Sequence, residues 1–388
     1  MGKIKVLAAV FNNPNAVFKA GETLSGYLQV EFSEPMKIKN IHLLIHGAAT
    51  VNFREDNDGS GGYSSYHQYV NHPVFLYGNE RGESKEAVLH PAGQFKYPFT
   101  HKLASDLPST FEGAYGWVRY FVKATVEIPW HFNQKTTRAF SVVGSLDLNN
   151  EPDLLKPIQV ESDKEMKFLF FKQGSISATF SLNRRGYVAG EVVQINAAIT
   201  NNSSRKIKHT RVDFHQQIAY HATWSGLAAG RQKTQWSSHH LAFIKKGEVN
   251  AHSTQIWENE LIQIPALPPS RLGSCDFIDI NYILTLKIRP AGSSTSLQIP
   301  IEIVIGTVPL KNLFSPPPSK EREEKAESAS RAALAERPLP PYPGNAPPPT
   351  YAESVFGSVQ FEDYDEDANK QQLFQYTPYY TYYICDNT

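Results

Sequence analysis

The sequence predicts an all-β chain with two tandem immunoglobulin-like β-sandwiches followed by a mostly disordered, proline-rich tail. Three observations predict it: apolar and polar residues alternate with a period of two, the two halves resemble each other, and the composition changes after Pro309. Such alternation is typical of strands with one buried face, and many short strands of this kind favour sandwiches. We expect domains at residues 1–150 and 161–309, a linker at 151–160, and the tail at 310–388.

In the first half, three stretches have an apolar residue at every second position. Every second residue of a strand lies on the same face, so we expect these residues to be buried together. They are Leu24, Gly26, Leu28, Val30 and Phe32; Ile41, Leu43, Ile45, Gly47, Ala49, Val51 and Phe53; and Val118, Tyr120, Val122, Ala124, Val126 and Ile128. Residues 54–62 predict a hairpin loop, since a calcium loop starting at Asp56 would need a glutamate where His67 stands.

Four further rows of alternating residues follow in the second half. They are Val193, Ile195, Ala197 and Ile199; Val212, Phe214, Gln216, Ile218 and Tyr220; Ile278, Ile280, Tyr282, Leu284, Leu286 and Ile288; and Ile299, Ile301, Ile303 and Ile305. No long segment in either half shows helical periodicity. The second half is therefore expected to be a β-sandwich as well.

The two halves repeat short patterns in the same order. Residues 20–24 (AGETL) correspond to residues 189–193 (AGEVV), 169 positions later. The same separation pairs Ile38 with Ile207, Leu43 with Val212 and Ile45 with Phe214. Further on, Pro108-Ser109 corresponds to Pro269-Ser270, and Tyr120 to Tyr282. A duplicated sandwich is the economical explanation.

Composition excludes several classes of protein. The chain has 388 residues with 38 basic and 38 acidic side chains, so no overall field attracts nucleic acid. Two cysteines cannot build a disulfide framework, and the first residues lack the apolar core of a signal peptide. No stretch approaches the roughly 18 apolar residues of a membrane span. We therefore expect a soluble cytoplasmic protein that does not bind nucleic acid.

Candidate catalytic or metal-binding residues are few. Cys275 is best interpreted as a small buried apolar residue. His239 and His240, with His215 and His221, are the one histidine group that could bind a metal, but their spacing fits no standard zinc site. The sequence contains no CxxC, HExxH or P-loop motif. We expect no catalytic residue, no cofactor and no metal.

The tail contains two candidate docking motifs. Pro348-Pro349-Thr350-Tyr351 is a PPxY motif, and Leu339-Pro340-Pro341-Tyr342 is a near match. Prolines favour a polyproline II helix, which WW domains bind in an aromatic groove, so Pro348, Pro349, Tyr351, Leu339, Pro340 and Tyr342 are the expected partner-binding residues. The alternative is a stiff linker with incidental tyrosines. Residues 379–384 (YYTYYI) either pack onto a sandwich edge or remain loose.

Several motifs resemble those of the arrestin family. Residues 107–120 (LPSTFEGAYGWVRY), Pro129-Trp130 and residues 147–149 (DLN) resemble the arrestin N-terminal domain. Residues 185–191 (RGYVAGE), residues 268–275 (PPSRLGSC) and residues 305–309 (IGTVP) resemble the C-terminal domain. With PY motifs behind both domains, the chain is similar to the α-arrestins, the arrestin-domain-containing proteins.

The resemblance implies the arrestin fold and a non-enzymatic adaptor that links membrane receptors or transporters to HECT ubiquitin ligases with WW domains. It implies endocytosis and protein transport, with recruitment from the cytoplasm to plasma membrane and endosomes and peripheral contact with membranes. One alternative is a metabolic or signalling regulator similar to thioredoxin-interacting protein, which would need a reactive cysteine before Pro269-Ser270; no cysteine precedes Cys275. The other alternative is a scaffold without a ligase role.

Overall fold

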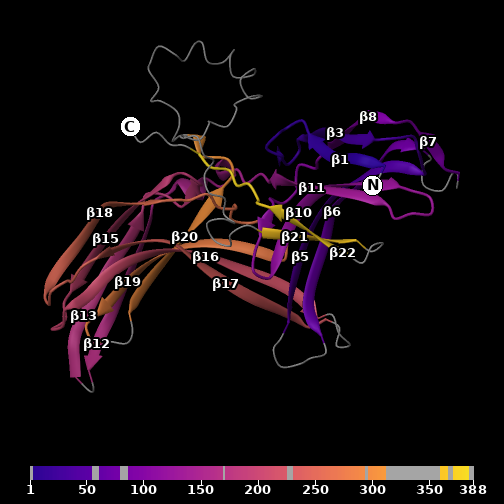
Figure 1. Cartoon of the computed structure of the whole chain (residues 1–388). Helices are drawn as coiled ribbons and strands as arrows, with labels where there is room; N and C mark the ends of the chain where they lie inside the picture. The colour runs from indigo at the N-terminus through magenta and orange to yellow at the C-terminus, as the bar shows by residue number, and fades with distance from the viewer. Residues whose placement is uncertain are drawn as a thin grey trace, which may run out of the picture.

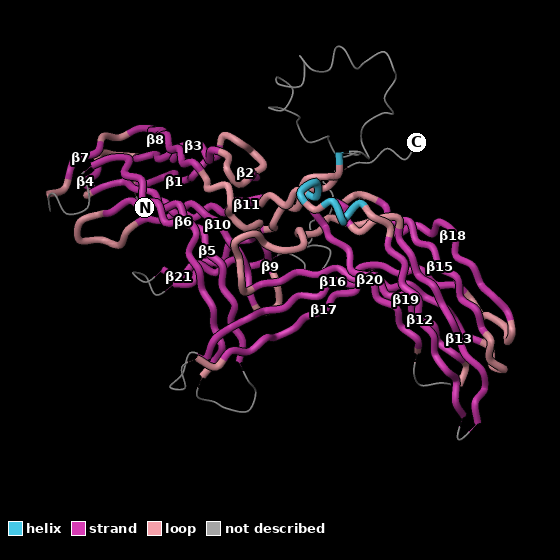
Figure 2. The backbone as a smooth tube through the Cα atoms, turned by 180° about the vertical axis from the view of Figure 1, so that it is seen from behind, coloured by secondary structure: helices cyan, strands magenta, loops and turns pink. Residues whose placement is uncertain are grey.

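The computed structural model describes residues 3–54, 61–78, 86–168, 171–224, 230–292, 296–311, 359–365 and 370–383. It describes the backbone alone for residues 166–168, 171–173, 359–365 and 370–375. Two lobes built almost wholly of strands meet near the middle of the molecule (Figure 1). Figure 2 shows that the helices are confined to short turns at this junction. The predicted all-β fold class is confirmed.

The described residues of the N-terminal lobe form eleven strands. They are β1 (Ile4–Phe11), β2 (Val17–Lys19), β3 (Thr23–Phe32), β4 (Met36–Ile38), β5 (Asn40–Arg54), β6 (Gly62–Gly78), β7 (Val88–His90), β8 (Gly93–Lys102), β9 (Phe111–Glu112), β10 (Gly116–Glu127) and β11 (Gln134–Val143). One sheet has the order β1-β3-β8, and the facing sheet has the order β6-β5-β10-β11-β2. Strands β4 and β7 form a separate pair.

In the part of the C-terminal lobe that the structure describes, there are nine strands. They are β12 (Ile158–Phe168), β13 (Phe171–Leu182), β14 (Gly186–Val188), β15 (Val192–Asn201), β16 (Ile207–Trp224), β17 (Gln232–Lys246), β18 (Ser253–Gln263), β19 (Ile278–Pro290) and β20 (Leu297–Gly306). One sheet has the order β12-β13-β15-β18, and the other continues β14-β20-β19-β16, with β17 beside β16. The 3-10 helices η1 (Leu148–Asn150) and η2 (Pro152–Leu155) precede β12.

Every residue expected on a buried strand face is buried, in both lobes. The predicted hairpin between β5 and β6 is also confirmed, because Arg54 pairs with Gly62 across it. Strand β12 begins at Ile158, within the segment expected to be a linker. The reason is that Ile158 and Val160 pair with Leu182 and Phe180 of β13 and so extend the sheet.

The duplicated motifs make similar hydrogen bonds in both lobes, although the tyrosine acceptor in the second lobe is Pro268, one residue before the repeated Pro269-Ser270. The hydroxyl of Tyr120 donates to the Pro108 carbonyl (2.8 Å), and that of Tyr282 donates to the Pro268 carbonyl (2.7 Å). Likewise, the Ser109 hydroxyl accepts from the Gly144 amide (2.8 Å), and the Ser270 hydroxyl accepts from the Ile305 amide (3.0 Å). The sequence repeat thus corresponds to a repeat of local structure.

One sheet runs through both lobes. At the junction, β6 pairs with β16 through Ser64–Thr223 and Tyr63–Trp224, and the Tyr63 and Trp224 rings lie 5.1 Å apart. Most of the buried apolar residues of both lobes belong to one contiguous cluster, and a smaller one lies around Leu148 and Leu154. Hydrogen-bonded pairing and shared apolar burial therefore hold the lobes together.

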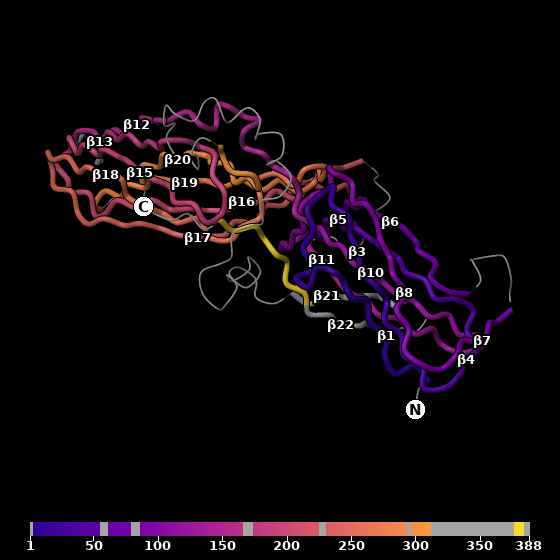
Figure 3. Tube along the Cα trace, turned by 90° about the horizontal axis from the view of Figure 1, so that it is seen from above, coloured from indigo at the N-terminus to yellow at the C-terminus, as the bar shows by residue number. Residues whose placement is uncertain are grey.

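The chain returns to the junction after residue 358. Strands β21 (Val359–Asp365) and β22 (Lys370–Tyr376) pair with each other. Figures 1 and 3 place them beside the N-terminal lobe. Residues 377–383 then run from that lobe toward the C-terminal one.

Candidate functional site

The two predicted docking motifs lie outside the described residues. All six expected partner-binding residues fall between Lys311 and Val359: Leu339, Pro340, Tyr342, Pro348, Pro349 and Tyr351. The start of this segment is attached at the junction, where Asn149 donates to the Pro309 carbonyl (2.9 Å) and accepts from the Lys311 amide (3.0 Å). Further along the chain, Tyr376 contacts the N-terminal lobe through a hydrogen bond with Ser141.

Residues 376–383, here called the C-terminal strap, connect the two lobes. On the N-terminal lobe, the Ser141 hydroxyl of β11 forms a hydrogen bond with the Tyr376 hydroxyl (2.7 Å) and accepts one from the Tyr379 amide (3.0 Å). Tyr380 and Thr381 follow and are buried. Of the two alternatives left open for the aromatic C-terminal residues, the structure therefore shows packing onto the sandwiches.

The strap ends on the C-terminal lobe at the repeated AGE turn. The Tyr383 amide donates to the Ala189 carbonyl (2.9 Å), and its hydroxyl donates to the Thr307 carbonyl (2.6 Å). Gly190 has a φ of +96°, and a Cβ on it would lie 1.8 Å from the Tyr383 carbonyl oxygen. A glycine is required here because the strap backbone lies directly against it.

Burial perturbs the tyrosines of the strap. It raises the pKa of Tyr376, Tyr379 and Tyr383, since the phenolate form would lose its hydration. All three hydroxyls therefore stay protonated at neutral pH, and those of Tyr376 and Tyr383 serve as hydrogen-bonding groups. The strap is a structural contact between lobes.

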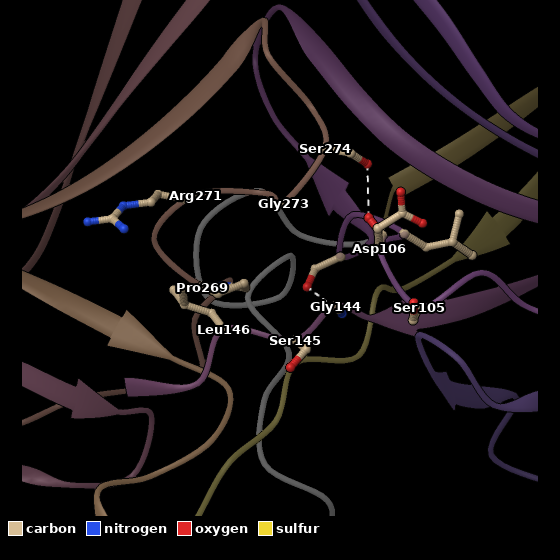
Figure 4. A pocket seen from close by; sticks show the side chains of 11 residues that line it. Ser105, Asp106, Gly144, Ser145, Leu146, Pro269, Arg271, Gly273 and Ser274 are labelled. Atoms are coloured by element: carbon tan, nitrogen blue, oxygen red, sulfur yellow. Dashed lines mark hydrogen bonds between the residues drawn. The ribbon is translucent and has the colours of Figure 1, made fainter. Parts of the chain in front are cut away.

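A cavity of about 320 Å³ lies at the junction beside the strap (Figure 4). Its lining comes from the two repeated proline–serine loops and the segment after β11: Ser105, Asp106, Leu107, Ser109, Gly144, Ser145, Leu146, Pro269, Arg271, Gly273 and Ser274. Ser274 donates to the Asp106 carbonyl (2.9 Å), which closes one wall, while the Arg271 guanidinium points away from Asp106 and pairs with Glu151 (2.7 Å).

The lining of the junction cavity is rich in hydroxyl groups. It includes four serines and Asp106, and neither histidine nor lysine, the usual bases that activate a serine, is among the lining residues. The Ser109 and Ser274 hydroxyls are already engaged with the Gly144 amide and the Asp106 carbonyl. The cavity can accept hydrogen-bonding groups of a small ligand or of a peptide backbone.

The predicted histidine group is brought together only in part. His215 and His240 lie beside Asp213, at 4.0 and 3.1 Å from its carboxylate oxygens. His221 instead pairs with Asp279 (2.9 Å). His239, the strand neighbour of His240, points to the opposite face. These histidines converge on Asp213. The sequence pattern does not single it out, because it lies between two apolar residues of β16.

Cations already surround the Asp213 carboxylate. Arg211 forms an ion pair with it, and the Lys287 ammonium lies at 3.0 Å. Burial acts to raise the pKa of Asp213, but the hydrogen bonds from Lys287 and His240 outweigh it, so the pKa is lowered. Arg211, Lys287 and Arg289 line the adjoining pocket with these histidines, and repulsion from them would oppose a metal cation. The group fits an ion-pair network on β16, β17 and β19.

Cys275 is buried, as the sequence predicts. Burial raises the pKa of its thiol, so the neutral form dominates at physiological pH. A thiolate is the nucleophilic form of cysteine, and this site opposes it. Cys385 lies outside the described residues. None of the helices that the structure describes is long and apolar enough to cross a membrane.

Comparison with known proteins assigns both lobes to one family. The model of the arrestin (or S-antigen) N-terminal domain matches residues 7–149, and that of the C-terminal domain matches residues 172–310. Arrestin domain-containing protein 17 of Caenorhabditis elegans is 34% identical over 312 residues, covering 77% of this chain and 70% of that protein.

Two further relatives span similar lengths. Mouse (Mus musculus) arrestin domain-containing protein 4 is 30% identical over 363 residues, covering 91% of this chain and 83% of the relative. Human (Homo sapiens) thioredoxin-interacting protein is 27% identical over 306 residues, covering 79% and 75%. The two family-model matches, residues 7–149 and 172–310, include both lobes and their repeated motifs. The chain therefore belongs to the arrestin family, among the arrestin-domain-containing proteins, or α-arrestins.

Proposed function

We propose that this chain is a trafficking adaptor that recruits HECT ubiquitin ligases to membrane-protein cargo. The observation that carries the proposal is the pair of motifs, Leu339-Pro340-Pro341-Tyr342 and Pro348-Pro349-Thr350-Tyr351, on a segment attached to a two-lobed arrestin body. The lobes hold the receptor or transporter through loops and sheet faces, and the motifs hold the ligase. Ubiquitination then directs the cargo into endocytosis and protein transport.

The motifs suit WW domains for a physical reason. Proline fixes φ near −65° and has no N–H, so the rod is partly ordered before it binds and loses little entropy on docking. Its prolines then occupy the aromatic groove while the tyrosine fills a second pocket. Tyr351, which completes the full PPxY motif, should contribute more than Tyr342.

Two motifs on one chain raise the local concentration of the second after the first has bound. As an extended polyproline II helix, the segment from Tyr342 to Tyr351 would span about 28 Å at 3.1 Å per residue. That length favours exchange of one WW domain between motifs, or capture of two domains that are close together. Either process slows escape of the ligase.

The cellular location follows from this role. An adaptor between a ligase and a membrane protein works in the cytoplasm and moves to the plasma membrane and endosomes with its cargo. The chain has equal numbers of basic and acidic residues, so overall charge does not direct it. Local surfaces and the cargo would set its membrane contact.

Tyrosine substitutions test ligase recruitment. Tyr351→Ala should weaken capture of a WW-domain HECT ligase about tenfold or more, because one buried aromatic side chain is lost from its pocket. Tyr342→Ala should weaken capture less, and the double variant most. Binding is measured by titrating the full-length chain against the isolated WW domains.

Pro317→Ala is the matched control, because it changes a proline run that has no tyrosine behind it. It should bind like the unchanged chain. Equal affinity of the Tyr351→Ala chain would refute ligase recruitment through this motif. The relationship to thioredoxin-interacting protein would then favour a regulator or scaffold without a ligase role, and burial of Cys275 argues against a thiol mechanism for it.

A further inference from the structure

The turn between β10 and β11 presents two aromatic side chains to solvent. This turn, residues 129–133 and here called the β10–β11 tip, contains Trp130, which is 100% exposed, and Phe132, which is 74% exposed. His131 between them is also exposed. Two large apolar side chains without cover on one short turn indicate a surface that another phase or molecule covers.

Strand pairing and a side-chain hydrogen bond define the conformation of the tip. Strands β10 and β11 remain paired up to Val126 and Gln134, and the Asn133 side chain accepts a hydrogen bond from the Ile128 amide (3.2 Å). Trp130 has a φ of +63°, a left-handed conformation that is unfavourable for a residue with a bulky side chain. The fold thus accepts backbone strain at the residue whose indole is fully exposed, and such strain is often found at functional sites.

Basic residues lie beside the tip. The Lys39 amide donates to the Glu127 carbonyl (2.7 Å), which holds Lys39 next to the end of β10. Lys37 is exposed on β4, opposite Leu89 of β7, and Leu89 is itself exposed. Of the nearby carboxylates, Glu127 accepts from Asn40 (3.2 Å), and Glu34 pairs with Lys3 (3.0 Å). Lys37 and Lys39 are therefore two exposed cations at this end of the lobe.

We propose that the β10–β11 tip, with Lys37 and Lys39, docks this chain on the anionic face of a membrane. Trp130 and Phe132 would enter the interfacial layer of the bilayer, and the lysines would contact anionic headgroups. Tryptophan favours this layer because its ring is apolar and its N–H is polar. Basic residues near such a surface add electrostatic attraction.

A bilayer fits this surface better than a protein groove. The two aromatic side chains are 100% and 74% exposed on a short turn, so they can enter a fluid layer without a complementary pocket. A fluid interface needs only apolar area and positive charge. The tip also lies at the end of the N-terminal lobe away from the junction, where Figure 1 shows β7, so docking leaves the strap and the junction cavity uncovered.

Vesicle binding tests this inference with the full-length chain. The chain should sediment with vesicles of phosphatidylcholine and phosphatidylserine, and much less with phosphatidylcholine alone. Trp130→Ser combined with Phe132→Ser should reduce the partition coefficient about tenfold or more, since two aromatic side chains no longer leave water. Lys37→Glu with Lys39→Glu should reduce it on anionic vesicles.

Trp236→Ser is the matched control, because Trp236 is exposed on β17 of the other lobe. It should bind vesicles like the unchanged chain. Trp130→Gly should lose binding while its Tm stays the same or rises, because glycine adopts positive φ freely. That result would separate lost docking from lost folding.

Unchanged vesicle binding by the Trp130/Phe132 variant would overturn the inference, as would absence of binding by the unchanged chain. Sedimentation without lipid provides a further check. If the unchanged chain dimerises and the Trp130/Phe132 variant does not, the tip is an interface between copies and the membrane assignment is wrong. The inference is independent of ligase recruitment, so the Tyr351→Ala chain should still bind vesicles.

Discussion

The hydroxyl groups of Tyr120 and Tyr282 hold a loop in place in each lobe. Each belongs to a fully buried side chain and donates to a proline carbonyl of the repeated proline–serine loop. Tyr282 also accepts a hydrogen bond from the Gln216 side chain (3.0 Å). A buried polar group that loses its partner costs about 1–3 kcal/mol, so these hydroxyls anchor the loops that line the junction.

Phenylalanine substitutions test this arrangement. Tyr120→Phe should lower the free energy of unfolding by about 1–2 kcal/mol, and Tyr282→Phe by more, because the second hydroxyl serves two partners. Denaturant unfolding of the two variants gives the comparison. Tyr66→Phe, at an exposed tyrosine of β6, should have almost no effect. A larger loss for Tyr120→Phe than for Tyr282→Phe would contradict the explanation.

At the scale of elements, the repeat gives the C-terminal strap a natural control. Gly21 and Gly190 occupy equivalent AGE turns, with φ values of +82° and +96°. A Cβ on Gly21 would lie 3.5 Å from its nearest neighbour, Ser105, which is an ordinary contact. A Cβ on Gly190 would collide with the Tyr383 carbonyl. The two turns share a backbone requirement, and only the second also supports the strap.

Alanine at each glycine separates these roles. Both changes should destabilise the fold by about 1 kcal/mol through the positive φ. Gly190→Ala should also detach the strap at Tyr383 and expose its tyrosines to chymotrypsin. Limited proteolysis of the folded chains measures this, with cleavage in the strap expected for Gly190→Ala and not for Gly21→Ala. Equal cleavage of both variants would show that Gly190 does not seat the strap.

Across the whole molecule, partly buried histidines make stability depend on pH. Among the described residues, desolvation lowers the pKa of four of them: His101, His209, His215 and His239. Nearby cations, such as Lys287 beside His215, lower it further. The folded chain then binds fewer protons than the unfolded chain, whose histidines titrate near 6.5. This stability is complete above that pH and is lost as the pH falls through it.

Acidification should therefore weaken the fold. We expect the denaturant midpoint to be lower at about pH 5.5 than at about pH 7.5, where the unfolded histidines are mostly neutral. His215→Gln should reduce the difference. Burial raises the pKa of the Glu112 carboxyl, which opposes this trend. A midpoint that rises on acidification would show that carboxyls dominate.

The features of the fold that could be predicted are those that depend on residues close together in the sequence. Alternation in β5, β10, β16 and β19 identified their buried faces correctly, because a strand with one face in the core must alternate wherever it lies in the sheet. The proline–serine and AGE repeats identified the duplication in the same way. The linker was the exception, since the start of β12 depends on its pairing with β13.

The candidate sites also differ in whether their residues are contiguous in the sequence or come together only in the fold. The PPxY motif is contiguous, so its residues could be named from the sequence, and its role stays a prediction. The Asp213 network combines β16, β17 and β19, and sequence spacing could not reveal that Lys287 and His240 face one carboxylate. Trp130 was noted as part of a family motif, but nothing in the sequence indicated that its side chain is fully exposed.

By itself, the sequence determined the all-β class, the two repeated sandwiches, the buried face of each strand tested and the arrestin family. These follow from periodicity and short motifs, which depend on neighbours along the chain. Only the tertiary structure decided that β6 pairs with β16, that the strap crosses from Ser141 to Ala189, and that the β10–β11 tip lies uncovered. Each of these is set by contacts or exposure between distant residues, and no local pattern encodes which distant surfaces meet.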